Sequence, residues 1–238
     1  MKTMTIRCRR WTGTVLFISL AACQQSPQSS QPTANDLGAA AQLPGAGAVK
    51  AAIEPFEMIA EQAFSASPAE LATMIARAQA SYRAAEPALT PQQRTAAAVQ
   101  LKSLTAADGK ASRTATALAS IELYRQLLEA QHQPHDPAVM AGLLDYAGFR
   151  YQALVQAEQV DWQALFRTTV FAKGEWRRLS PLIDDASLRD RFAASVDAMA
   201  NAAAVRDRPA ALKAAASELE LVDQLEKNLA SAPRRAAP

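Results

Sequence analysis

Charged and aromatic side chains are densest in two short stretches of the sequence, Glu122-Leu123-Tyr124-Arg125 and Asp145-Tyr146-Ala147-Gly148-Phe149-Arg150-Tyr151. Guanidinium groups pair well with carboxylates and other anions, and phenols donate hydrogen bonds to them. Two interpretations stay open: a polar network that fixes the register of two helices, or a shallow recognition surface for a partner or a small anionic ligand. The candidate binding residues are Glu122, Tyr124, Arg125, Asp145, Tyr146, Arg150 and Tyr151.

Other residue types that support catalysis or metal binding occur in few combinations. Glu129 and His132 form a Glu-x-x-His pattern of the kind used by di-iron helical bundles, but such bundles need two of these motifs and two further glutamates. The other histidine, His135, follows directly in the turn. The sequence has no Gly-x-Ser-x-Gly for a nucleophile elbow, and its Gly-x-Gly occurs at 45–47, in a stretch without the pattern of a strand. The sequence therefore predicts a non-enzymatic protein with no cofactor and no metal site.

The first residues of the chain have the pattern of a secretion signal. Lys2, Arg7, Arg9 and Arg10 precede an apolar run over 11–22, which is too short for a permanent membrane span. The run ends in Leu20-Ala21-Ala22-Cys23, which resembles the lipobox of bacterial lipoproteins. The resemblance implies a diacylglyceryl group on Cys23, cleavage after Ala22, and a mature protein held to a membrane by its acyl chains, palmitate among them.

Position 24, the next residue of the mature chain, indicates a destination. In the lipoproteins that this sequence resembles, an aspartate there retains the product at the inner membrane, and this chain has Gln24. The expected location is the cell envelope of a Gram-negative bacterium, with the periplasmic face of the outer membrane favoured over the inner membrane.

Cleavage also changes the charge and the thiol content. The full chain has 25 Lys and Arg against 23 Asp and Glu, and removal of four basic residues with 1–22 leaves 21 against 23. A net charge of about −2 gives no basic footprint for nucleic acid. Cys8 leaves with the signal and Cys23 carries lipid, so no disulfide, cysteine metal site or cysteine nucleophile is expected in the mature domain.

The remainder of the chain divides into three parts by composition. Residues 23–46 comprise the lipidated cysteine and a segment rich in Gln, Ser, Pro, Gly and Ala, which predicts a flexible tether. Residues 47–230 carry helical patterns throughout, and residues 231–238 are expected to be a disordered tail. Ser67 and Thr90 are each followed by a proline and, three residues later, by Glu or Gln, which predicts a capping box at the start of a helix. The predicted helices are 48–65, 68–87, 91–106, 110–132, 137–158, 161–179, 186–205 and 208–229.

The core of this domain is expected to consist largely of alanine and leucine, with Trp162 and Trp176 in it. In the last helix the predicted apolar stripe consists of Leu212, Leu219, Val222 and Leu229. The pattern predicts an all-α protein, an antiparallel helical bundle of about seven or eight helices, with a helical-hairpin solenoid as the alternative. The expected function is that of an envelope binding or scaffold protein that contacts another envelope protein. The alternative is a ligand- or metal-binding helical bundle.

Overall fold

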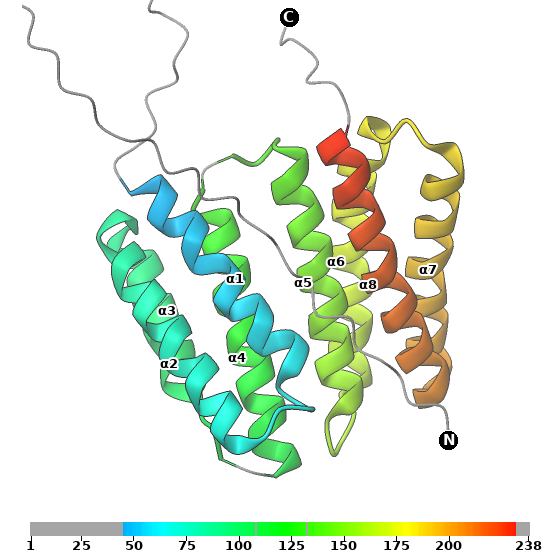
Figure 1. Ribbon diagram of the computed structural model, residues 1–238. Helices are drawn as coiled ribbons and strands as arrows, with labels where there is room; N and C mark the ends of the chain where they lie inside the picture. The colour runs from blue at the N-terminus through cyan, green and yellow to red at the C-terminus, as the bar shows by residue number, and fades with distance from the viewer. Residues whose placement is uncertain (1–44, 108, 132, 232–238) are drawn as a thin grey trace, which may run out of the picture. The chain divides into compact units, whose positions relative to one another are not determined.

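The chain folds into α-helices joined by short connections (Figure 1). The computed structural model describes residues 45–107, 109–131 and 133–231, and these residues form eight α-helices, two short 3₁₀ segments and no strand. The predicted signal, almost all of the predicted tether, His132 and all but the first residue of the predicted tail lie outside the described residues. The elements are α1 (Ala46–Gln62), α2 (Pro68–Ala85), η1 (Glu86–Ala88), α3 (Pro91–Ser103), α4 (Lys110–Glu129), α5 (Pro137–Gln156), α6 (Trp162–Leu179), η2 (Ser180–Leu182), α7 (Ala186–Val205) and α8 (Arg208–Ser231). The predicted all-α bundle is confirmed.

Local capping explains where several of these helices begin. The Ser67 hydroxyl accepts from the Glu70 backbone N–H at 3.3 Å, and the Glu70 carboxylate accepts from the Ser67 N–H at 2.8 Å. Thr90 and Gln93 repeat this arrangement at the start of α3, so both predicted capping boxes are confirmed. Asp136 caps α5 through the Ala138 N–H. Each cap satisfies backbone donors that the first helical turn leaves without an acceptor.

The helices run alternately up and down, and α5 lies in the middle of the array (Figure 1). On one side, α4 packs against α5 and is itself covered by α1 and α3, while α2 packs on α1. On the other side, α6 and α8 pack against α5, and α7 lies against both of them. Helix α5 is therefore enclosed by neighbours, and all its residues from Val139 to Phe149 are buried.

Two glycines let neighbouring helices approach α5 closely. A Cβ added at Gly142 would lie 3.0 Å from the Leu128 side chain of α4. A Cβ at Gly148 would lie 2.1 Å from Oε2 of Glu218 and 2.6 Å from Cδ2 of Leu219, both on α8. Small residues at these positions thus set how closely α4 and α8 pack on the central helix.

Alanines as well as large apolar residues form the buried face of α8. The predicted stripe was wrong at Leu212, which is 38 % exposed, whereas Ala211, Ala214 and Ala215 are buried. Counting only large side chains misplaces the buried face of a helix in which alanines make up half of the buried apolar residues. Elsewhere in the core, Trp176 is buried as predicted and Trp162 is half-buried.

No helix within the described ranges combines the length and the apolar content that crossing a membrane requires.

A pair of helical glycines, Gly148 of α5 and Gly174 of α6, offers a direct test of the close packing on α5. Gly148→Ala is expected to destabilise the protein by about 1–3 kcal/mol, because the new methyl group overlaps two side chains of α8. Gly174→Ala in α6 meets nothing within 4 Å, so it is expected to stabilise the helix by about 0.5–1 kcal/mol. Urea unfolding of both variants measures the difference. Equal effects of the two substitutions would show that α8 does not pack closely on Gly148.

Candidate functional site

A polar network joins α4 to α5, and Glu122 is its centre. Oε1 of Glu122 accepts hydrogen bonds from the Tyr146 hydroxyl at 3.0 Å and from the Arg150 guanidinium. Oε2 accepts from Nε of Arg125 at 3.2 Å, and Nη1 of Arg125 also donates to Glu129 at 2.6 Å. The four candidate residues Glu122, Arg125, Tyr146 and Arg150 are therefore brought together between two antiparallel helices.

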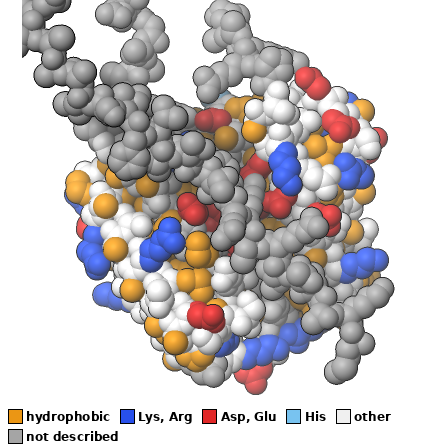
Figure 2. Space-filling view, viewed as in Figure 1, with side chains coloured by type: hydrophobic (Ala, Val, Ile, Leu, Met, Phe, Trp, Pro, Cys, Tyr) orange, Lys and Arg blue, Asp and Glu red, His pale blue; other side chains and the backbone are white. Residues whose placement is uncertain are grey.

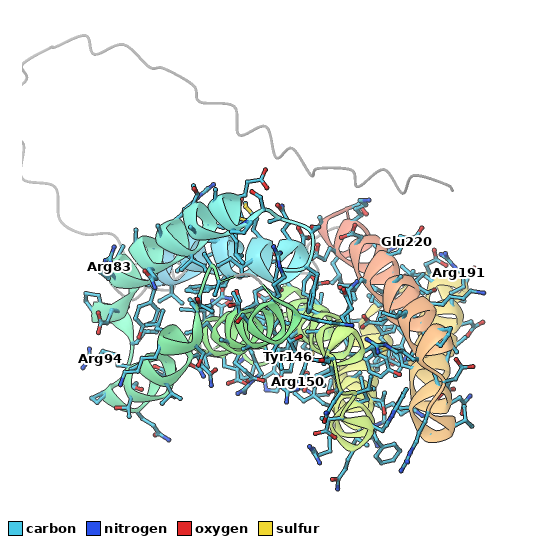
Figure 3. The ribbon with its side chains drawn as sticks, turned by 90° about the horizontal axis from the view of Figure 1, so that it is seen from below. Arg83, Arg94, Tyr146, Arg150, Arg191 and Glu220 are labelled. Carbon is cyan, nitrogen blue, oxygen red and sulfur yellow. The ribbon has the colours of Figure 1, made fainter. Side chains whose placement is uncertain are left out.

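Aromatic contacts complete this network. The Arg125 guanidinium lies 5.6 Å from the centroid of the Tyr146 ring, and the same ring meets Phe171 of α6 edge-on, with centroids 5.2 Å apart. In Figure 3, Tyr146 and Arg150 lie beside α6 on the side of the bundle opposite α1. Burial raises the pKa of Tyr146 to about 12, with the Glu122 carboxylate adding to the shift, so its hydroxyl stays protonated and donates.

The charges within the network largely compensate one another. Burial by itself lowers the pKa of Arg125, but the carboxylates of Glu129 and Glu122 outweigh this effect and raise it. Two guanidinium groups thus face two carboxylates, and the side chains of Arg125, Arg150 and Glu122 are between 18 % and 29 % exposed. An arrangement that is neutral, mutually bonded and partly buried holds two helices in register more readily than it attracts an external anion.

The other three candidate residues lie elsewhere. Tyr124 is buried on α4, with its hydroxyl against Gly142. Tyr151 is fully buried, and its hydroxyl donates to the backbone carbonyl of Met199 on α7 at 2.8 Å. Burial raises the pKa of Tyr151 to about 12. The seven candidate residues therefore do not form one site.

Asp145 belongs to a different group of carboxylates, on the face formed by α1, α5 and α8. It is buried, and its pKa is raised well above the usual value by burial and then by neighbouring negative charges. These charges are Glu57 of α1 and Glu218, Asp223 and Glu226 of α8; with Asp145 they form what we call the acidic cluster. Figure 2 shows acidic side chains on this face of the molecule.

Glu218 is the most unusual member of the acidic cluster. Its side chain is fully buried, and neither carboxylate oxygen has a hydrogen-bond partner. Oε2 lies over Gly148, one turn of α5 beyond Asp145. Burial raises the pKa of Glu218 well above its usual value, so its neutral form is favoured.

The sequence contains a signal that Glu218 is buried, but the spacing of the large apolar residues alone does not show it. Ala214, Ala215, Leu221 and Val222 are buried on the same face of α8, at three- and four-residue spacing around Glu218. A carboxylate at the centre of such a stripe must lie in the interior. Because the stripe is half alanine, the predicted register passed through Leu219 instead.

A cavity of about 330 Å³ opens at one end of the bundle. Its lining includes Lys110, Arg113 and Arg208, together with the apolar Phe64 and Leu212. Arg113 donates to the carbonyls of Ala63 and Ala66, both at 2.7 Å, and Arg208 donates to that of Ala157 at 2.9 Å. These arginines therefore bond to carbonyls that follow the ends of α1 and α5, and they also make the cavity positive.

Metal-binding residues do not converge in the part of the chain that the structure describes: no three His, Cys, Asp or Glu side chains there are placed to hold an ion. His135 is exposed, and Glu129 pairs with Arg125. His132, the other half of the Glu-x-x-His pattern, lies outside the described residues.

No known protein family, curated protein or solved structure matches this chain.

The α4–α5 network is tested by removing one of its charges. Arg150→Met is expected to lower the free energy of unfolding by about 1–2 kcal/mol, because the partly buried Glu122 loses one of its donors. For a domain of this size the midpoint of thermal unfolding should fall by roughly 2–8 °C. The control is Arg167→Met, since Arg167 is 60 % exposed and 4.0 Å from Asp161, and its loss should cost less than about 0.5 kcal/mol. An unchanged midpoint for Arg150→Met would contradict a structural role for the network.

The raised pKa of Glu218 predicts how stability depends on pH. Because the folded protein keeps this proton to higher pH than the unfolded chain, the free energy of unfolding should fall as pH rises above about 4.3, the ordinary value for Glu, until the folded-state pKa is reached. Asp145 contributes with the same sign, and Glu57, Asp223 and Glu226 strengthen its shift. Glu218→Gln should therefore be more stable than the unsubstituted protein by a larger margin at about pH 8 than at about pH 5.

Denaturant unfolding across this pH range measures the margin. The matched control is Glu220→Gln, an exposed position two residues further along α8. If both substitutions change the pH slope equally, the slope does not come from the buried carboxyl.

Proposed function

We propose that this chain is a bacterial lipoprotein whose helical bundle acts by binding another protein of the cell envelope. The observation that carries the proposal is Leu20-Ala21-Ala22-Cys23 after a basic and then apolar leader. Acyl chains on Cys23 tether the bundle, and Gln24 favours the periplasmic face of the outer membrane of a Gram-negative bacterium. Several acyl chains hold a protein on a bilayer much more firmly than one.

A non-enzymatic role is favoured by what the polar groups of the bundle do. At the α4–α5 network the guanidinium, phenol and carboxylate groups bond to each other on a partly exposed surface. Catalytic groups are usually set in a concave site with one another's help and with room for a substrate. The groups of the network do position one another, but they do not line the 330 Å³ cavity.

A second candidate, the ligand-binding bundle, is favoured by that cavity. Lys110, Arg113 and Arg208 line it together with Phe64 and Leu212, which fits a small anion with an apolar part. In this alternative the bundle stores or carries a small molecule rather than contacting a protein.

Lipid attachment is tested by Cys23→Ser. Since the thioether needs the cysteine sulfur, the variant should remain unprocessed or leave the membrane fraction, whereas the natural chain should be processed and sediment with membranes. Metabolic labelling with a palmitate analogue and fractionation measure both properties. A Cys23→Ser chain that is still processed and membrane-bound would contradict the proposal.

Partner binding is tested by chemical cross-linking in intact cells, followed by solubilisation, isolation through a C-terminal tag and mass spectrometry. One envelope protein captured in stoichiometric amount, and absent when Cys23→Ser removes the tether, is the expected result. If no protein is captured and native mass measurement finds a small bound anion, the ligand-binding bundle replaces the proposed function.

A further inference from the structure

The cavity at one end of the bundle receives cationic side chains from the starts of two helices. Lys110 is the first residue of α4, Arg208 is the first residue of α8, and both line this cavity of about 330 Å³. A cation at the amino end of a helix opposes the helix dipole, which is positive there, so the stability of these helices does not explain either residue. An anion in the cavity removes the conflict, because the side chains and the helix ends both attract it.

Lys110 and Arg208 keep their charge available to a ligand. Among the described residues, neither is paired with a carboxylate. Arg208 donates to the Ala157 carbonyl at 2.9 Å, but this acceptor is neutral and uses one of the five N–H groups of the guanidinium. Arg113 also lines the cavity, but it is engaged with two backbone carbonyls and has a further partner, so its role is to shape the wall.

The rest of the wall contributes a donor and apolar surface. Gln156, half-buried at the end of α5, carries an amide that can donate, and Phe64 and Leu212 form the apolar part. No carboxylate is found among the described residues that line the cavity. Asp207 is close in sequence, but it caps α8 by accepting from the Ala210 N–H at 3.0 Å.

This lining fits a carboxylate that carries one apolar group beside it. A volume of about 330 Å³ is at the small end of the range for ligand sites, which is about 300–1,000 Å³. The two apolar side chains cover one apolar side chain of a ligand rather than a long alkyl chain. Because the cavity opens at the end of the bundle, a longer chain can continue outward from it. The C-terminal residue of a polypeptide combines these features.

We propose that this cavity binds the C-terminal carboxylate and the last, apolar side chain of the envelope partner. This inference rests on the proposed function, because it names the part of the partner that is recognised. The carboxylate accepts from Lys110 and Arg208, and the apolar side chain packs against Phe64 and Leu212. Gly109, the N-cap of α4, offers no side-chain acceptor to the first helical turn, so the N–H groups of that turn add to the attraction.

The test uses the full-length lipoprotein in a non-ionic detergent and acetyl-Ala-Ala-Leu with a free carboxylate as the probe. The same peptide with a C-terminal amide lacks the charge, and acetyl-Ala-Ala-Ser lacks the apolar side chain. Isothermal titration at about 0.15 M salt measures each affinity, with long-range attraction screened. The natural protein should bind the leucine carboxylate about tenfold or more tighter than either of the other peptides.

Two matched pairs of variants locate the site. Lys110→Gln should weaken binding of the leucine carboxylate about fivefold or more and leave its amide unaffected, whereas Lys227→Gln, towards the other end of α8, should change binding less than about twofold. Leu212→Asn should remove the preference for leucine over serine, whereas Val99→Asn on α3 should keep it. All four side chains are exposed, so the variants should fold, and thermal unfolding checks this.

Four outcomes overturn the inference. Absence of binding at about 1 mM peptide would show that the cavity has no such ligand, and equal binding of the amide would show that the carboxylate is not recognised. Equal weakening by Lys110→Gln and Lys227→Gln would show general charge attraction without a site. If octanoate displaces the peptide and binds about tenfold more tightly, the carboxylate comes from a free amphiphile and not from a protein.

The closing experiment separates this inference from the proposed function. The cross-linking in cells is repeated with Lys110→Gln and Leu212→Asn together. Loss of the captured partner supports the inference, and undiminished capture shows that the partner binds elsewhere while the proposed function stands. Peptide binding as expected with no partner captured from the natural protein would leave the site and overturn the function.

Discussion

The structure depends on the enclosure of α5 by its neighbours. Residues Val139 to Phe149 are all buried, which is possible because Gly142 and Gly148 let α4 and α8 approach. Dispersion contacts at such short range are individually small and collectively large, and they are lost quickly when helices separate. Over these residues the helix has no solvent-facing side, so each polar side chain among them must find its partners inside the protein.

The polar residues of α5 meet this constraint in different ways. Tyr146 donates to Glu122 on α4, and Tyr151 donates to a backbone carbonyl of α7, so each phenol links α5 to a different neighbour. Asp145 instead lies among other carboxylates and near Glu218, whose oxygens have no hydrogen bond. Two tyrosines thus strengthen the bundle, whereas the buried carboxyl group of Glu218, which has no hydrogen bond, weakens it. The difference separates residues that the fold explains from residues that require another explanation.

The helices and their starts were predictable because their determinants are local. At the helix starts at Ser67 and Thr90, a hydroxyl and the carboxylate or amide three residues later lie within one turn. They satisfy the backbone N–H groups of that turn without any tertiary contact. The pairing of Glu122 with Arg125 is equally local, and the short connection from α4 to α5 brings Tyr146 and Arg150 to it. The sequence places Asp145 beside Tyr146 and Arg150, but in the structure the charges that act on it include Glu57 and Glu218, which are distant in sequence. Placing Glu218 required the register of an alanine-rich helix, which the spacing of large residues does not fix.

The charge balance of the chain bears on how it can recognise anything. With 25 basic and 23 acidic residues, or 21 and 23 under the proposed processing, long-range steering is weak at physiological salt. Recognition through charge must then act at short range, where carboxylates are shielded from water and a single ion pair is strong enough to discriminate. The neutral α4–α5 network is poorly suited to this, because its charges are already paired. Asp145 and Glu218 are buried, and their raised pKa values favour neutral carboxyl groups, so the fold does not have to hold two bare charges in its core.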